Sequence, residues 1–347
     1  MRLRTALIAG AGALLLAALG ASLYWLYAAG AVRDGVERWV EERRAEGYVV
    51  GYRTLEVRGF PLFLRAEVSE PSLARSGAYG SWEWRGAALH AAIRPWNFQH
   101  LTLSFPGAQR VEFNPLNQAR VLTASVGGAW AALAFDPAGA LRHGVLELEN
   151  VELAGLSQSD LLRVGWARLE ARFRNPPPPT HQSASIEISV TMQALDLPAR
   201  AAGPLGPNID GIQAEASLMG VIPPGPPAEA VAGWRDDGGT VELERLVLDW
   251  GPLELKANGT LALDQAMQPI GSLTAEIRGY AETLDALVQA GAAPPRDAAI
   301  AKVVLNLLAQ TPPGGGPPVL TVPLTAQDGR LFVGPVALIE LPPIEWP

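Results

Sequence analysis

The most constraining feature of the sequence is an apolar segment close to its N-terminus. The segment from Ala6 to Ala28 holds 23 residues and no charge. At about 1.5 Å of rise per residue, a helix of this length crosses roughly 30 Å of hydrocarbon. Arg2 and Arg4 are the only charges before it, and the positive-inside rule keeps such an end in the cytoplasm. We expect a single-pass protein of the inner membrane, with a cytoplasmic N-terminus and a periplasmic body.

A cleaved secretory signal is the alternative interpretation of the same segment. The small residues 28–31 follow the apolar stretch and form a possible cleavage site. The stretch is longer than the roughly 7 to 15 apolar residues of a typical signal, which favours an uncleaved anchor. Both interpretations export the body. With an anchor, Tyr24, Trp25 and Tyr27 are expected at the outer interface of the membrane, where amphipathic rings are favoured.

The anchor helix is predicted to continue as a stalk. Apolar residues recur at helical spacing from Val32 to Val40, with charged residues between them. The helix is expected to end near Glu46, with Gly47 as its C-terminal cap. Residues 1–46 are therefore assigned to a transmembrane anchor and helical stalk.

The rest of the chain is dominated by the alternation typical of β-strands. In one segment Leu62, Leu64 and Ala66 occupy one face and Arg65 and Glu67 the other. Similar segments are 101–105, 145–153, 164–173, 186–192, 212–218, 243–250, 253–263 and 273–277. Turn signals are Ser69–Ser72, Phe105–Gly107, Asp136–Gly139, Trp250–Pro252 and Asn258–Gly259. The short spacing predicts a mainly β fold with a few helices: an elongated, twisted, mostly antiparallel sheet.

Pro-rich runs and two helical segments divide this body. Pro176–Pro179 is the best boundary, which separates a β-rich half at 47–174 from a second half at 183–347 with late helices. Helices are predicted at 281–289 and 294–310. The second helix carries an apolar stripe, expected to pack against the sheet rather than to lie exposed at a lipid-facing mouth: Ile300, Val303, Val304, Leu307 and Leu308.

Composition argues against several classes of function. The chain has a net charge of −8, which disfavours binding to nucleic acid. It contains no cysteine, so it has neither disulfides nor a thiolate nucleophile. Its four histidines, His90, His100, His143 and His181, show no metal-binding spacing. We find no catalytic motif and expect a nonenzymatic protein without cofactor or metal.

A cluster of aromatic and basic residues is the only candidate ligand site. Trp82, Trp84, Trp96 and Phe98 lie within seventeen residues, with Arg85 and Arg94 between them. Aromatic side chains favour contact with lipid or a partner protein, and arginine binds phosphate or carboxylate headgroups. The alternative is that the two tryptophans that share a strand face, Trp82 and Trp84, simply fill a seam of the core.

Several segments resemble an uncharacterised family of membrane-anchored bacterial envelope proteins, typical of alphaproteobacteria and known as a domain of unknown function. They are Arg58–Leu62, the Trp-rich strand before Arg94-Pro95, Trp250–Leu253 and Gly334-Pro335. The glycine-led strands Gly259–Leu261 and Gly271–Leu273 are more distantly similar to AsmA-like proteins. That resemblance implies a single N-terminal helix and a role in lipid movement or envelope assembly.

Two functions remain open at this point. The first is lipid handling or envelope assembly, with an apolar sheet face that accepts acyl chains or an envelope-protein client beside the membrane lipid bilayer. The second is a structural or interaction protein, which binds a partner complex through a sheet edge or the stalk.

Overall fold

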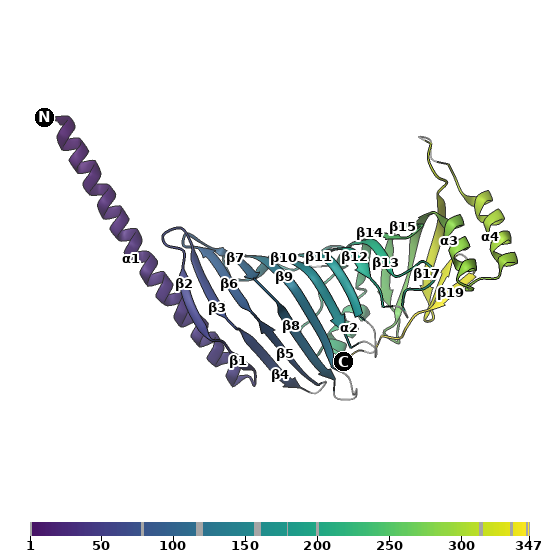
Figure 1. Cartoon of the computed structure of the whole chain (residues 1–347), viewed down its shortest axis with the longest axis horizontal. Helices are drawn as coiled ribbons and strands as arrows, with labels where there is room; N and C mark the ends of the chain where they lie inside the picture. Colours follow the sequence, from purple (N-terminus) through teal and green to yellow (C-terminus); the bar gives the residue numbers. More distant parts are fainter. Residues whose placement is uncertain are drawn as a thin grey trace. The chain divides into compact units, whose positions relative to one another are not determined.

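The computed structural model describes residues 2–77, 80–115, 121–155, 161–178, 180–198, 201–311, 315–333, 336–344 and 346. These residues form a mainly antiparallel β fold with a few helices, which confirms the predicted fold class (Figure 1). Contacts group the chain into two units. The N-terminal unit is Met1–Gly139 with Leu148–Leu156, and the C-terminal unit is Ala140–Glu147 with Ser157–Pro347. This division precedes the Pro-rich boundary expected at Pro176–Pro179. The family motif Gly334-Pro335 lies outside the described residues.

The first element, α1 (Arg2–Ala45), is one uninterrupted helix. It ends one residue before the predicted position, and Gly47 follows with φ 86°. The amide of Gly47 donates to Arg44 O at 3.0 Å. A positive φ at this place suits glycine, which has no Cβ to clash with the backbone.

The C-terminal half of α1 packs on the sheet of its own unit. Trp25 is 9% exposed and Ala28 is 6% exposed, and both contact Leu64, which is fully buried. The indole Nε1 of Trp25 donates to Phe63 O at 2.8 Å. The sheet therefore covers the Trp25 ring, and the location of this residue at the membrane interface stays a prediction. The preceding part of α1 stands clear of the sheet (Figure 1).

The N-terminal unit builds long strands from pairs of short ones. The strands are β1 (Val49–Gly51), β2 (Thr54–Arg58), β3 (Leu64–Ser69), β4 (Ser72–Gly77), β5 (Gly80–Gly86), β6 (Ala88–Arg94), β7 (Asn97–Phe105), β8 (Gln109–Pro115), β9 (Leu122–Phe135) and the end of β10 (Leu141–Ala154). Strand β9 pairs with β8 through its first half and with β7 through its second. Likewise β5 pairs with β4 and β8, whereas β6 pairs with β3 and β7.

Two of the predicted turns are therefore breaks within a continuing strand. At Glu70-Pro71 the chain passes from β3 to β4, and at Pro106-Gly107 it passes from β7 to β8, without reversing direction. Proline has no N–H for the ladder, so it interrupts the pairing. On β9, the interruption at Pro106-Gly107 faces Gly127 and Gly128, which fall between the two paired segments. The break thus continues across neighbouring strands.

The C-terminal unit is a meander in which each strand pairs with the next. Its strands are β11 (Leu161–Phe173), β12 (Ala184–Asp196), β13 (Asn208–Met219), β14 (Thr240–Trp250), β15 (Leu253–Leu263), β16 (Pro269–Arg278), β17 (Leu320–Gln327), β18 (Arg330–Val333) and β19 (Val336–Glu340). Helix α2 (Pro227–Asp236) separates β13 from β14. Helices α3 (Tyr280–Gln289) and α4 (Pro295–Leu308) separate β16 from β17.

Cross-strand register gives this sheet one apolar and one polar face. On the apolar face Ala257 pairs with Ala275, and Ala275 pairs in turn with Val322. On the polar face Lys256 pairs with Glu276. Successive residues alternate between the faces. The densest core forms where α3 and α4 lie on the apolar face, and it includes Tyr280 at 6% exposure.

The structure corrects two sequence predictions in this unit and adds one helix that was not predicted. The apolar stripe of α4 is not core: its five members are 49 to 81% exposed. Helix α4 instead packs inward through Ala298, which is buried, and Leu305, which contacts the core. Asn258-Gly259 is not a turn but lies inside β15. Helix α2 was not predicted, although its start has Pro at the first helical position, which suits the fixed φ of proline.

Candidate functional site

An apolar cavity of about 640 Å³ lies between α3, α4 and the sheet of the C-terminal unit. Figure 1 shows the two helices side by side on one side of the last strands. Ten of the thirteen lining residues are aliphatic, and the other three are Tyr280, Thr283 and Asp297. The aliphatic ones are Leu253, Ile277, Leu284, Ile300, Ala301, Val304, Leu305, Leu320, Val322 and Val333. A volume of this size falls in the range of roughly 300 to 1,000 Å³ that small-molecule sites occupy.

Polar contacts fix the two helices that form one wall of this cavity. The Tyr280 hydroxyl at the start of α3 and Asn306 Oδ1 in α4 are hydrogen-bonded at 2.8 Å. Lys302 Nζ forms an ion pair with Asp285 at 2.5 Å. Both contacts join α3 to α4, so the helices are held to each other by polar bonds and to the sheet by apolar packing. These contacts fix the positions of the two helices that form the cavity wall.

Two exposed side chains of α4 give the mouth of the cavity an apolar side. Ile300 and Val304 line the cavity and are also 56% and 49% exposed. They belong to the exposed stripe of α4, which therefore extends from the cavity wall to the helix surface. Water solvates such a surface poorly, and contiguous apolar surface at a cavity entrance marks a binding site for an apolar group.

The apolar face of the sheet extends beyond the cavity. On β11 and β12, Leu169 and Ile188 belong to this face and are 42% and 39% exposed. Helix α2, between β13 and β14, covers another part of this face with Trp234, whose Nε1 donates to Met219 O at 2.7 Å. A second apolar cavity, of about 310 Å³, lies beside Trp234 and includes Trp346. Helices thus cover this face only in part.

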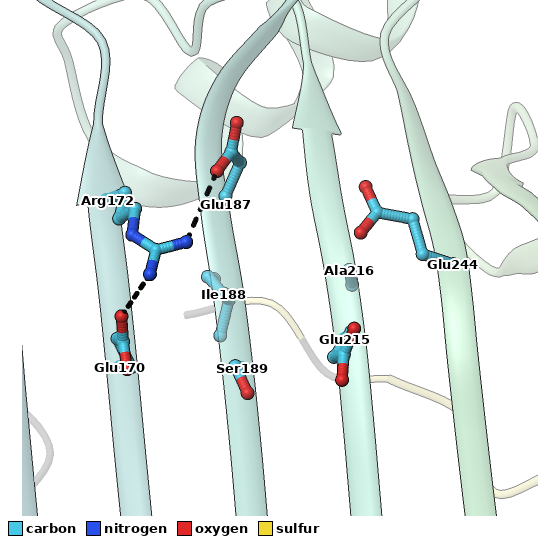
Figure 2. Close-up of a pocket in the computed structure, with 8 residues that line it drawn as sticks. All are labelled: Glu170, Arg172, Glu187, Ile188, Ser189, Glu215, Ala216 and Glu244. Atoms are coloured by element: carbon cyan, nitrogen blue, oxygen red, sulfur yellow. Dashed lines mark hydrogen bonds and ion pairs between the residues drawn. The ribbon is translucent and has the colours of Figure 1, made fainter.

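The opposite face of the same sheet carries a shallow acidic hollow of about 280 Å³. Figure 2 shows the carboxylates of Glu187, Glu215 and Glu244 on three successive strands. Within this hollow Arg172 contacts Glu170 at 2.6 Å and Glu187 at 3.9 Å. Arginine thus offsets part of the negative charge.

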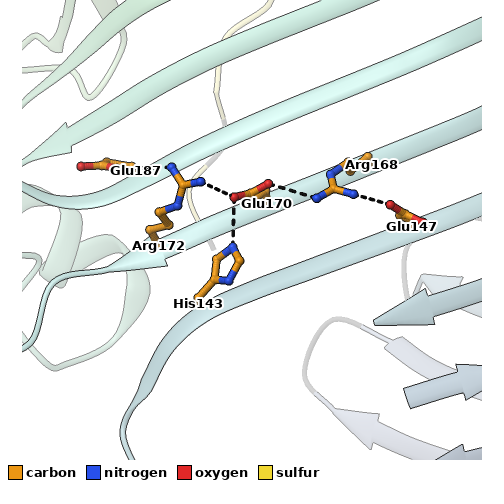
Figure 3. A network of polar contacts seen from close by, with 6 residues as sticks. All are labelled: His143, Glu147, Arg168, Glu170, Arg172 and Glu187. Atoms are coloured by element: carbon orange, nitrogen blue, oxygen red, sulfur yellow. Dashed lines mark hydrogen bonds and ion pairs between the residues drawn. The ribbon is translucent and has the colours of Figure 1, made fainter. Parts of the chain in front are cut away.

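Glu170 is the centre of the polar network in Figure 3. Its carboxylate contacts His143 Nε2 at 3.0 Å, Arg168 at 3.2 Å and Arg172 at 2.6 Å. Arg168 also pairs with Glu147. The hydrogen bond from His143, followed by that from Arg168, lowers the pKa of Glu170 against the opposing effect of burial. A carboxylate held ionised in this way stabilises neighbouring strands and is a weak base.

The described part of this network lacks the geometry of a catalytic or metal site. His143 and Ser189 lie on strands on opposite sides of the strand that carries Glu170, so they do not form a nucleophile and base pair (Figures 2 and 3). In the described residues, no three His, Cys, Asp or Glu side chains are grouped so that they could hold a metal ion. The polar face therefore supports a structural role.

The residues predicted as a ligand site are not brought together. Trp82 and Trp84 lie on one face of β5, where Trp84 donates to Gln109 Oε1 at 3.2 Å and packs against Phe105 at 6.0 Å. Trp82 packs against Tyr48 at 6.3 Å. Arg85, on the other face, pairs with Glu83 at 2.8 Å. These contacts fit the alternative interpretation, in which the tryptophans fill a seam beside the sheet.

The other three predicted residues lie at the far end of β6. Arg94 is its last residue, Trp96 lies in the hairpin to β7, and Phe98 is the second residue of β7. Ten residues of nearly extended chain, roughly 33 Å, separate Trp84 from Arg94. Trp96 is 64% exposed and Phe98 is 54% exposed. The cavity between α3 and α4 was missed because its lining comes from segments spread from Leu253 to Val333, which only the meander unites.

Fold and site together define an antiparallel β protein with a long N-terminal apolar helix and an aliphatic cavity under two late helices. By length and composition α1 can cross a membrane, and it is compatible with an anchor or a signal sequence. Residues 25–342 match the model of a family described as "uncharacterized protein conserved in bacteria (DUF2125)", and the chain belongs to this family. No curated protein and no solved structure matches the chain. The similarity to AsmA-like proteins stays a prediction.

Proposed function

We propose that this protein is a membrane-anchored, nonenzymatic envelope protein that binds acyl chains on the apolar face of its C-terminal unit. The observation that carries this proposal is the cavity of about 640 Å³ between α3, α4 and the sheet, with an aliphatic lining and an apolar mouth at Ile300 and Val304. An acyl chain matches such a lining because it needs no hydrogen bonds and gains from leaving water. Lipid handling or envelope assembly is the corresponding role.

An uncleaved anchor is part of the proposal. Cleavage at residues 28–31 would remove Trp25 and Ala28 from the cluster around the fully buried Leu64. It would also remove the donor that satisfies Phe63 O. The folded N-terminal unit thus uses α1 as one of its packing elements. Together with Arg2 and Arg4 before the span, this supports a cytoplasmic N-terminus and a periplasmic body.

A cavity-filling substitution tests the proposal. Ala301→Trp places an indole in the cavity, whereas Ala299→Trp makes the same change at an exposed position of the same helix. The full chain of each variant is extracted in mild detergent, and copurified lipid is quantified by mass spectrometry. We expect Ala301→Trp to lose most of the bound lipid and Ala299→Trp to retain it. Equal lipid in both variants contradicts binding in this cavity.

The alternative function, in which a filled sheet binds a partner through its edge, predicts a different result. It requires no accessible apolar space, so neither substitution should change lipid content. In that case, loss of a copurified partner after substitutions on the edge strand β1 would support the interaction role.

A further inference from the structure

Two hairpin tips of the N-terminal unit lie beside the point where α1 leaves the sheet. Gly59–Phe63 joins β2 to β3, and Pro95-Trp96 joins β6 to β7. The Tyr24 hydroxyl donates to Pro95 O at 2.9 Å, and Trp25 Nε1 donates to Phe63 O at 2.8 Å. Because Tyr24 and Trp25 are consecutive, both tips meet the same turn of the helix. Hydrogen bonds thus join both hairpin tips to α1 at the point where the helix leaves the sheet.

Large apolar side chains are exposed at both tips. The exposed fraction is 55% for Phe60, 57% for Leu62 and 40% for Phe63 in the first tip, and 64% for Trp96 in the second. Phe60 also packs edge-on against the Trp25 ring at 5.5 Å. Exposed apolar residues grouped in this way indicate a contact surface rather than scattered surface residues. Their continuity with an apolar helix points to the membrane that the helix enters.

The backbone of the tips is suited to an apolar environment. Pro61 and Pro95 have no N–H to satisfy. The amide of Phe63 donates to Gly59 O at 2.9 Å, while the carbonyls of Phe63 and Pro95 accept the indole and hydroxyl donors of α1. An unpaired backbone group costs several kcal/mol in hydrocarbon. These bonds remove much of that cost at the tips.

The length of the helix places the tips at the correct depth. The 18 residues from Ala6 to Leu23 span about 27 Å of a hydrocarbon core that is roughly 30 Å thick. The predicted span ends at Ala28, three residues after Trp25, so the tips lie about 5 Å inside the outer hydrocarbon boundary. This is the depth at which interfacial segments bury their apolar face. Arg65 and Arg94 flank the tips and, among the described residues, neither forms an ion pair.

We propose that these two hairpin tips insert into the interface of the bilayer that α1 crosses, with phospholipid as their ligand. The tips, with α1, form a three-point attachment that fixes the depth and orientation of the N-terminal unit. Arg65 and Arg94 bind headgroup phosphates. This inference rests on the proposed membrane anchoring and adds contacts that a single flexible anchor would not make.

Site-specific fluorescence in vesicles tests the insertion, and the absence of cysteine makes single labelling clean. The full chain carrying one cysteine at Leu62, Trp96, Leu19 or Lys256 is labelled with an environment-sensitive fluorophore. It is reconstituted in vesicles of phosphatidylethanolamine and phosphatidylglycerol that contain spin-labelled lipid quencher. Leu19 reports on the helix, and Lys256, which is exposed on the polar face of the C-terminal sheet, is the control for an exposed position away from lipid.

We expect the quencher to reduce emission at Leu62→Cys and Trp96→Cys nearly as much as at Leu19→Cys, with little loss at Lys256→Cys. Quenching at Leu19→Cys alone overturns tip insertion while the anchor stands. Equal quenching at Leu62→Cys and Lys256→Cys also overturns it, because the contact would then not be specific to the tips. If Leu19→Cys is not quenched either, the anchoring proposal itself fails.

Discussion

Leu64 offers a quantitative test that α1 is a structural part of the N-terminal unit. Its side chain is fully buried between the sheet and the helix, in contact with Trp25 and Ala28. Leu64→Ala removes three carbon atoms, a transfer loss of roughly 2.4 kcal/mol at about 0.8 kcal/mol each. The residual cavity adds to this loss, so we expect a destabilisation of about 3 to 5 kcal/mol. Leu62→Ala is the matched control, since Leu62 is 57% exposed two residues earlier.

Hydrogen exchange followed by mass spectrometry measures this effect locally, on the full chain in mild detergent. Each 1.4 kcal/mol changes an equilibrium constant tenfold. Leu64→Ala should therefore accelerate hydrogen exchange in β3, β6 and residues 24–45 by at least roughly a hundredfold. Leu62→Ala should change it by about twofold at most, as a surface substitution does. Similar acceleration by both variants would refute the packing of α1 on the sheet.

Two further predictions concern the sheet of the C-terminal unit. Gly259 has φ 154°, and a Cβ there would lie 2.2 Å from Ser272 O. Gly259→Ala should therefore lower the midpoint of thermal unfolding. The control is Gly35→Ala in α1, where a Cβ would have nothing within 4 Å, and this change should leave the midpoint unchanged or raise it. A higher midpoint for Gly259→Ala would show that the strands are not this close. Because the pKa of Glu170 is lowered in the folded chain, its stabilisation is complete above its ordinary pKa of 4.5 and is lost as pH falls through the lowered value. Thermal stability should therefore fall less on acidification in Glu170→Gln than in Glu229→Gln. If the unfolding midpoints of the two variants depend on pH in the same way, the network around Glu170 is contradicted.

The periodic features of the fold were predictable from the sequence. Alternation of Leu64, Ala66 and Val68 reflects a real strand face, and α3 and α4 lie close to the predicted segments. The distinction between a turn and a break was not predictable. Glu70-Pro71 carries the same residue types as a hairpin turn, but tertiary pairing holds the chain in one direction.

The candidate site was less accessible to sequence reasoning, for two physical reasons. Proximity in sequence suggested that Trp84 and Trp96 act together, yet extended chain separates residues by about 3.3 Å each. The stripe of α4 was assigned to the core because apolar periodicity alone does not reveal which side of a helix faces the sheet. In the structure, Ala298 and Leu305 face the core, and the five residues of the stripe remain exposed.

Photo-crosslinking is the most direct test of acyl-chain binding. The full chain in vesicles is irradiated with a phospholipid that carries a diazirine on its acyl chain, and modified peptides are mapped by mass spectrometry. We expect adducts in α3, α4 and β15–β17, around the cavity lined by Ala301 and Leu305, and we expect their loss in Ala301→Trp. Adducts confined to α1 and the hairpin tips would contradict it, because lipid would then contact only the membrane-embedded surface.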